Sequence, residues 1–322
     1  MRQSVWVVMA ALVAFTAPAD AQSFPTRPIR MLIPFPAGGP SDIIARAMEP
    51  ALREKLGAAV VIDNRSGAAG NIASEIVAKA TPDGHTILMA TIGTHAINYS
   101  LYSKPSFHPL RDFTPIALLS ESPNVLVVHP RLSASSVPEL IALAKAKPGV
   151  LNYGSGGAGT TLHLSAELFS VMTGVRMVHI PFKGVSETLP ALIGGEIDLI
   201  FASLSAAMPF VKSGKLKAFA VTGARRSPSI PELPTVAEAA DLPDFAATAW
   251  FGLVGPAGMP RAVVEVLHKN ALAVLDDAEV SKRFLFTGLE KLPGGPQQFA
   301  KFIEAEMLKW ASVVKASGAR VN

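Results

Sequence analysis

The sequence predicts an α/β protein made of two lobes. Short apolar strands alternate with amphipathic helices along most of the chain, which predicts mixed, mostly parallel sheets flanked by helices. A strand, a glycine-rich turn and a helix follow one another twice, at 29–56 and at 151–173. The helices after residue 260 have no strand partner of their own, so we expect them to return and cover the first lobe.

The composition excludes several classes of function. The 322 residues are 49% hydrophobic and 17% charged, as in a folded protein, and they include no cysteine. Disulfides, thiolate metal sites and a cysteine nucleophile are therefore excluded. The net charge is +4, but no Lys/Arg run is longer than Arg225-Arg226, so we expect no nucleic-acid partner. The seven histidines show no metal-ligand spacing, and we expect neither a metal nor a cofactor.

The N-terminus has the pattern of an export signal. Arg2 precedes an apolar run at 5–17, which is too short for a stable membrane anchor. Ala19-Asp20-Ala21 fits the small-x-small cleavage rule. We therefore expect residues 1–21 to be a signal peptide that is cleaved after Ala21, which makes the mature protein soluble and exported.

The first lobe begins with alternating strands and helices. We expect strands at 29–33, 59–62 and 86–90 and helices at 41–56 and 71–80. The turns that follow the strands, at 34–41, 64–70 and 91–95, all lie at the carboxyl edge of the sheet, where ligands bind in such folds. The proline-rich segment 99–115 is expected to be irregular.

The turn at 34–41 is the first candidate site. Pro40 suits the first helical turn, while Ser41 and Asp42 suit its positive end. Gly38 and Gly39 have no Cβ, so a ligand can approach their amides. Such a turn is either an anion-binding site or an ordinary tight connection without a ligand.

The second half of the chain repeats this pattern. We expect strands at 124–128, 151–153, 175–180, 198–201, 217–221 and 247–254, and helices at 137–146, 160–173, 185–193, 207–212, 236–240, 261–275, 279–286 and 296–316. Extended crossings near 124–128 and 246–252 would join the lobes and leave a cleft between them.

Residues 154–159 form a second glycine-rich turn that matches G-x-G-x-x-G. The following strand carries Arg176 and His179 but no ribose-binding acid, which disfavours a dinucleotide site. Ser155 is not in a G-x-S-x-G elbow because position 153 is Tyr.

Two acidic positions leave alternatives open. His163 and Glu167 are one helical turn apart and could share a metal, although a structural role is the more common outcome. Asp198 could receive a ligand or simply cap the backbone.

Many ordered motifs resemble those of the substrate-binding proteins of tripartite tricarboxylate transporters, the Bug receptors. The resemblance covers essentially all of the mature chain. The matching segments are 34–42, Asn64-Arg65 with Gly67 and Gly70, 82–84, 152–159 with His163 and 167–169, 181–184, 192–195 with Asp198, 214–216, 234–238 and 256–260.

The resemblance implies a class II-like periplasmic binding protein that captures a small carboxylate, without catalysis, and presents it to a membrane permease. It implies a monomer whose first lobe comprises 22–125 and 247–322 and whose second lobe comprises 126–246. The rival hypothesis is a secreted hydrolase or a dinucleotide-binding enzyme that uses the same loops. Transferred residue by residue, together with Thr94 of the third edge loop, the ligand contacts are Ala37, Gly38, Gly39, Ser41, Asp42, Ser155, Gly156, Gly159, Thr160, Thr161, Asp198 and Ser203.

Overall fold

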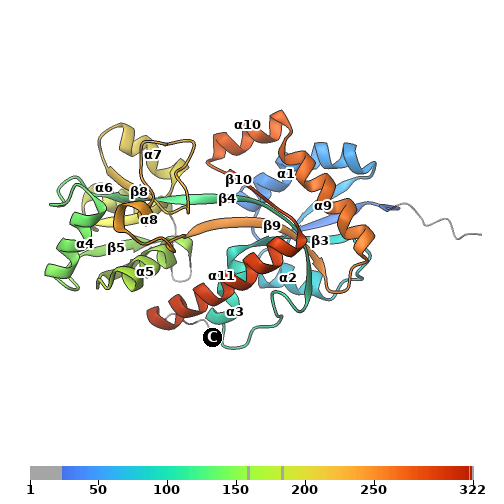
Figure 1. The fold of residues 1–322 in the computed structure, drawn as a ribbon, viewed down its shortest axis with the longest axis horizontal. Coiled ribbons are helices and arrows are strands. Elements are labelled where there is room, and N and C mark those ends of the chain that lie inside the picture. Colours follow the sequence, from blue (N-terminus) through green and yellow to red (C-terminus); the bar gives the residue numbers. More distant parts are fainter. Residues whose placement is uncertain (1–23, 158–159, 183–184, 319, 321–322) are drawn as a thin grey trace, which may run out of the picture.

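The computed structural model describes residues 24–157, 160–182, 185–318 and 320. The molecule is elongated, and its two α/β lobes lie side by side along the long axis (Figure 1). The expected signal peptide, residues 1–21, lies outside the described residues. No helix in the described part of the chain is long and apolar enough to cross a membrane.

The sheet of the first lobe combines parallel and antiparallel pairs. Strands β1 (Ile29–Ile33) and β2 (Val60–Asn64) pair in parallel, as do β1 and β3 (Thr86–Thr91). Strand β9 (Thr248–Pro256) then lies antiparallel between β3 and β4 (Phe113–Val128), and β10 (Glu290–Gly294) is antiparallel to β4. The carboxyl ends of β1, β2 and β3 therefore lie at one edge, as the sequence predicted.

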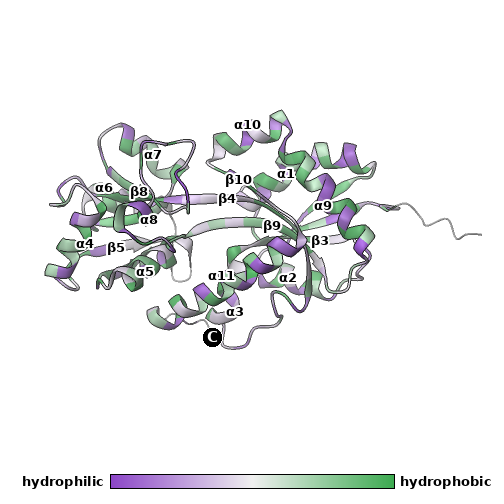
Figure 2. Ribbon diagram, in the orientation of Figure 1, coloured by the Kyte–Doolittle hydropathy of each residue, from purple (hydrophilic) through white to green (hydrophobic). Residues whose placement is uncertain are grey.

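Helices cover both faces of this first sheet. Buried residues of α1, α9 and α10 share one hydrophobic cluster, and those of α2 and α11 belong to another. Purple and green bands alternate along α9 and α11, as expected for amphipathic helices (Figure 2). The bounds are α1 Pro40–Leu56, η1 Ala68–Gly70, α2 Asn71–Ala78, η2 Gly93–Ile97, α3 Asn98–Leu101, α9 Arg261–Leu275, α10 Ala278–Thr287 and α11 Pro296–Ser317.

The second lobe has its own sheet. Strand β5 (Asn152–Ser155) pairs in parallel with β6 (Val178–Pro181) and β7 (Leu199–Ser203), and both β7 and β8 (Lys217–Val221) pair antiparallel to β4. The carboxyl ends of β5, β6 and β7 form the second candidate edge. The helices of this lobe are α4 Val137–Ala146, α5 Thr161–Thr173, α6 Val185–Gly194, α7 Leu204–Lys212 and α8 Val236–Ala240.

Strand β4 runs through both lobes (Figure 1). Its residues up to Pro123 pair with β9, and those from Asn124 onward pair with β7. The expected short strand at 124–128 is therefore the last part of a 16-residue strand. One crossing between the lobes lies at residues 123–124, close to where the sequence placed it.

Two further sequence expectations need correction. The segment 99–115 contains the end of α3 and the start of β4, and β10 gives the C-terminal helices the strand partner that we did not expect. Strand β4 was hidden because it contains two prolines, one of which, Pro115, lies beside a register shift in the pairing with β9. Strand β10 was hidden because the sequence 290–294 has a proline, a glycine and no apolar alternation.

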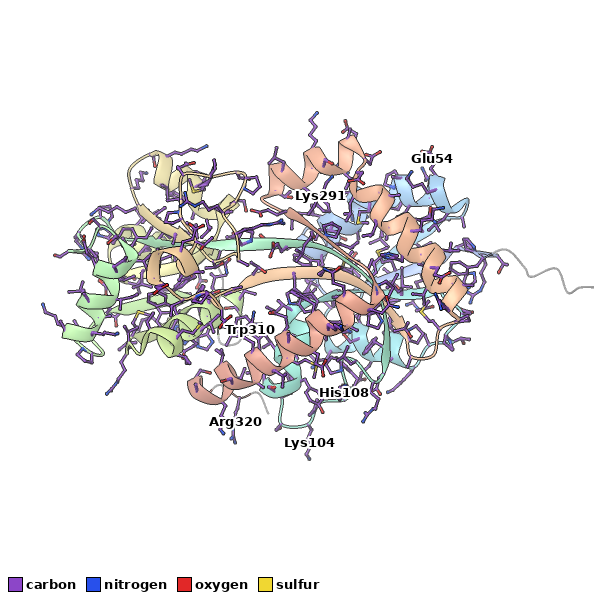
Figure 3. All side chains as sticks on the ribbon, in the orientation of Figure 1. Glu54, Lys104, His108, Lys291, Trp310 and Arg320 are labelled. Carbon is purple, nitrogen blue, oxygen red and sulfur yellow. The ribbon has the colours of Figure 1, made fainter. Side chains whose placement is uncertain are left out.

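The aromatic residues of α11 join the sheet to the outer helix layer. Trp310, labelled in Figure 3, and Trp250 of β9 are both buried, and their indole N–H groups donate to the same carboxylate oxygen of Glu306 at 2.9 and 3.0 Å. Because both indoles and the acid are buried, these hydrogen bonds satisfy polar groups that would otherwise be costly.

Candidate functional site

Asp42 organises the first glycine turn. Its carboxylate, 2% exposed, accepts hydrogen bonds from the Gly38 N–H at 2.9 Å, from Arg46 Nε at 2.9 Å and from Asn64 Nδ2 at 3.0 Å. Burial alone would raise the pKa of Asp42, but the hydrogen bonds from Arg46, Gly38 and Asn64 outweigh it and hold the pKa below its ordinary value. Asp42 is therefore ionised, and its buried carboxylate holds the turn in place through these hydrogen bonds.

The second edge loop is attached to the first. Asn64, at the end of β2, also donates to the Phe35 carbonyl at 3.0 Å, and the Arg65 N–H donates to the Ile33 carbonyl at 2.9 Å. One bond from a side-chain amide and one between backbone atoms thus connect the carboxyl ends of β1 and β2. The two loops thus form one surface.

The third edge loop packs against the other two at Gly70. A Cβ on this residue, which has φ +92, would lie 2.6 Å from Thr94 Cγ2 and 2.9 Å from Pro34 Cβ. Only glycine fits this contact, both for space and for backbone conformation. Thr94 is itself held by hydrogen bonds with Thr91 and with His95 Nδ1. The three turns that the sequence placed at one edge therefore meet there.

The exposed part of the first loop is small. Ala37 and Gly38 are exposed and Gly39 is half-buried, whereas the side chains of Ser41 and Thr94 are fully buried. The Gly38 N–H already donates to Asp42, and the Gly39 N–H points to the Pro36 carbonyl at 3.4 Å. The expected free amides at these glycines are thus engaged within the loop.

Ser41 has an unusual polar environment. Its Oγ is buried and has no hydrogen-bond partner among the described residues. It lies in the first turn of α1, where backbone N–H groups lack intrahelical acceptors. The positive end of a helix with spare backbone donors favours an anionic oxygen over an apolar group.

The second glycine turn is built around Ser155, at the end of β5. This residue is fully buried, and its Oγ accepts a hydrogen bond from the Gly157 N–H at 3.1 Å. Thr160 caps α5 by accepting from the His163 N–H. Gly156, Thr160 and Thr161 are partly exposed, and Gly159 lies outside the described residues.

The remaining two candidates of the second lobe lie at opposite ends of β7. Ser203 ends the strand, opposite Asn124 at the crossing between the lobes. Asp198 precedes the strand, and its Oδ2 accepts from the Asn152 N–H at 2.8 Å. The two are five positions apart along the strand, roughly 16 Å. Asp198 therefore caps the backbone at the amino end of β7, one of the two roles that the sequence left open, and its role as a ligand contact stays a prediction.

A ring cluster beneath the second turn was not singled out from the sequence. Tyr153, His163 and His179 stack on one another, and His163 Nε2 lies 3.9 Å from Glu167 Oε1. The described residues contain no group of three or more side chains suited to a metal. His163 and Glu167 thus belong to a cluster of packed rings. The three rings come from β5, α5 and β6, and no local spacing in the sequence could show that they meet.

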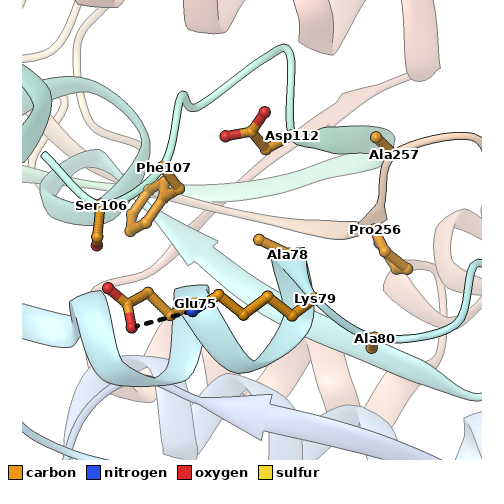
Figure 4. A pocket seen from close by; sticks show the side chains of 9 residues that line it. All are labelled: Glu75, Ala78, Lys79, Ala80, Ser106, Phe107, Asp112, Pro256 and Ala257. Atoms are coloured by element: carbon orange, nitrogen blue, oxygen red, sulfur yellow. Dashed lines mark ion pairs between the residues drawn. The ribbon is translucent and has the colours of Figure 1, made fainter.

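A separate cavity of about 290 Å³ lies away from these loops (Figure 4). It involves the end of α2, the segment before β4 and the end of β9, which all lie at the amino edge of β3. The turns described above lie at the opposite, carboxyl edge. The lining residues are Glu75, Ala78, Lys79, Ala80, Ser106, Phe107, Asp112, Pro256 and Ala257.

Comparisons of the sequence and of the fold with known proteins agree with each other. The family model described as tripartite tricarboxylate transporter family receptor matches residues 44–319. Protein BugT of Bordetella pertussis is 33% identical over 316 residues, covering 98% of this chain and 97% of BugT.

Two solved structures share the fold and were determined with acids. Rpa4515 of R. palustris, with adipate, is 38% identical with a TM-score of 0.75, covering 92% of this chain and 100% of its own. MatC (Rpa3494) from Rhodopseudomonas palustris, with bound malate, is 32% identical with a TM-score of 0.71, covering 90% and 100%.

Proposed function

Because the chain belongs to the tripartite tricarboxylate transporter receptor family, we propose that it captures a small carboxylate in a cleft between its two lobes and delivers it to a tripartite tricarboxylate-type membrane transporter. The observation that carries the ligand class is that two similar proteins hold adipate and malate, both dicarboxylates. The family is periplasmic, and its members bind small carboxylates.

The pairing of charged side chains in the first lobe supports binding of an anionic ligand without a salt bridge to either nearby arginine. Arg46 is paired with Asp42, and Arg65 is paired with Asp63 at 2.9 Å. A carboxylate is then recognised by hydroxyls, by the positive end of α1 and by backbone N–H groups other than those that the loop itself engages. We propose that the exposed positions Ala37, Gly38 and Gly39 contact the ligand directly, while the buried Ser41, Asp42 and Thr94 hold the surface in place.

The second lobe contributes the opposite side of the proposed site. Its partly exposed positions are Gly156, Thr160, Thr161 and Ser203, with Gly159 retained from the sequence motif. For the lobes we propose the boundaries 22–125 with 247–322 and 126–246. The change of β4 partners between Pro123 and Asn124 supports this division.

We further propose an exported monomer, cleaved after Ala21, that meets its permease transiently and binds without turnover. The rival enzyme hypothesis would need a reactive group in the same loops. Ser155 lies beside His179, but it is fully buried and its hydroxyl accepts from the Gly157 N–H. That arrangement favours a structural hydroxyl over a nucleophile.

Thermal-shift screening of the mature protein against mono-, di- and tricarboxylates, aromatic acids and amino acids tests the proposal. Binding stabilises the folded state by about 2.7 kcal/mol at a hundredfold excess of ligand over Kd. We expect at least one acid, adipate and malate being the first candidates, to raise Tm. No shift with any acid, or turnover of an ester or a reduced nicotinamide, would contradict the carboxylate receptor.

A matched pair of glycine variants locates the site in the same assay. Gly39 and Gly295 are both N-cap residues followed by proline, with φ/ψ of −77/166 and −75/173. A Cβ at Gly39 would meet only the Pro36 carbonyl at 3.4 Å, and one at Gly295 only the His268 ring at 3.6 Å. We expect Gly39→Val to abolish the shift and Gly295→Val to keep it, both with near-normal Tm. An equal response in the two variants would remove the first loop from the site.

A further inference from the structure

Three aromatic rings form a stack beneath the second glycine turn. The ring of His179, from β6, packs against Tyr153 of β5, with centroids 4.9 Å apart, and against His163 of α5, with centroids 4.1 Å apart, and the Tyr153 and His163 centroids are 6.3 Å apart. The interplanar angles are 16° and 28°, so the plane of the His179 ring is nearly parallel to the planes of the other two. Three elements of the second lobe thus meet through one imidazole.

Glu167 of α5 anchors the stack. The Tyr153 hydroxyl donates to Glu167 Oε1, which comes from the second turn of α5. Burial, followed by this hydrogen bond, raises the pKa of Tyr153 above its ordinary value, so the phenol keeps its proton. Burial lowers the pKa of His163 and of His179 to about 4, with a smaller contribution to His179 from the neighbouring His163. Both imidazoles are therefore neutral in the periplasmic range of pH.

His179 also contacts the turn itself. Its Nε2 lies 2.6 Å from Ser155 Oγ, the atom that accepts the hydrogen bond from the Gly157 N–H. The Ser155 carbonyl in turn accepts from the Phe182 N–H and from Thr188 Oγ1. Ser155 is fully buried, so its hydroxyl acts on the backbone of the turn and not on a solvent-borne molecule.

We propose that His179 is a positioning residue for ligand recognition, holding the turn 155–157 in its binding conformation through the Ser155 hydroxyl. The inference rests on the proposed function, because it assigns a role within the same site. Ser155 changes from a ligand contact, as the sequence suggested, to the link between the stack and the turn. His179 carries the effect although it lies outside the glycine motif, 24 residues further along the chain.

A double-mutant cycle tests the link. His179→Phe keeps a stacking ring and removes the hydrogen bond, while Ser155→Ala removes its partner. With the acid that shifts the wild-type melt, we expect each single variant to weaken binding about tenfold and the double variant to lose little more. Additive losses, or wild-type affinity in His179→Phe, would overturn the proposal. If His179→Phe fails to fold, His179→Leu replaces it in the same cycle.

Two further variants separate positioning from general damage to the stack. His179→Gln offers an amide to Ser155, and we expect it to recover most of the affinity. Tyr153→Phe keeps its ring and removes only the hydroxyl that donates to Glu167, so its affinity should stay near that of the wild type. No recovery with Gln, or a tenfold loss in Tyr153→Phe, would point to packing and contradict the specific role of His179.

Hydrogen exchange measured without ligand distinguishes failure of the proposed carboxylate binding from failure of the positioning role of His179. Exchange of the Gly157 amide hydrogen should be faster in His179→Phe and in Ser155→Ala than in the wild type, because its acceptor is displaced or removed. If the wild type binds no acid but exchange accelerates in both variants, the proposed function fails while the hydrogen-bonded link stands. If the wild type binds and neither affinity nor exchange changes in His179→Phe, the positioning role fails alone.

Discussion

His95 is a completely buried residue next to the third edge loop. Its ring packs edge-on to Phe113 with centroids 4.6 Å apart, and its Nδ1 hydrogen-bonds with Thr94 Oγ1 at 2.9 Å. Its Nε2 is buried without a partner among the described residues. The side chain therefore holds Thr94 in place through its Nδ1 hydrogen bond. Because the ring is completely buried, the neutral form of the imidazole is favoured.

Burial lowers the pKa of His95 to about 3 from an ordinary value of 6.5. As pH falls below 6.5 the unfolded chain gains a proton at this position, and the folded chain does not until about pH 3. Between these values the folded state binds fewer protons, so stability falls as pH falls. This contribution is fully present above pH 6.5.

The variant His95→Phe tests this linkage. We expect it to reduce the stability difference between pH 8 and pH 5 by about 2 kcal/mol, because one buried site no longer titrates. Urea unfolding of both proteins at the two pH values measures the difference. An unchanged difference would mean that His95 is protonated in the folded protein, or that the histidine does not control acid sensitivity.

At the scale of elements, Thr222 ties together the two segments that cross between the lobes. Its Oγ1 accepts from the Asn124 N–H at 2.9 Å and donates to the Ala247 carbonyl at 2.7 Å. Its backbone N–H and carbonyl bond to the same two residues, each at 2.9 Å. Since β4 changes partners at Asn124 and Ala247 directly precedes β9, Thr222 links the two segments at this point.

Thr222→Val keeps the shape of this buried side chain and removes the hydroxyl. It leaves the Asn124 N–H and the Ala247 carbonyl with a lost partner each, so we expect a loss of about 1–3 kcal/mol in the free energy of unfolding. Thr222→Ser, which keeps the hydroxyl, serves as the control and should lose less. Chemical denaturation compares them, and a Ser variant as unstable as the Val variant would assign the effect to packing.

For the whole molecule, the candidate ligand positions come from both lobes. A ligand that contacts both lobes favours the arrangement in which they are closer together. Small-angle scattering should therefore show a smaller radius of gyration when the wild type is saturated with an acid that raises its Tm. Gly39→Val at the same acid concentration should show no change. A wild type whose radius is unaffected by saturation would indicate a preformed, static site.

The sequence by itself determined features that depend on local physics. Alternating periodicities predicted the strands and helices, and the glycine and proline positions predicted where α1 begins and ends: Gly39 is its N-cap, Pro40 its first residue, and Gly57 ends it at φ 65. The order of strands, turns and helices also predicted that three turns share one edge. Many ordered motifs predicted the family.

Only the tertiary structure decided what depends on distant partners. Strand β10 exists because β4 offers it an antiparallel partner, although its own residues carry no strand pattern. Asp198 and Ser203 were both candidates from the sequence, and the contacts of the strand show Asp198 capping the backbone at one end of β7 and Ser203 opposite Asn124 at the other. Likewise, the contact between Ser155 and His179 depends on the parallel pairing of β5 and β6. Register, burial and side-chain contact arise from packing between segments that no local pattern encodes, and these contacts define the candidate site.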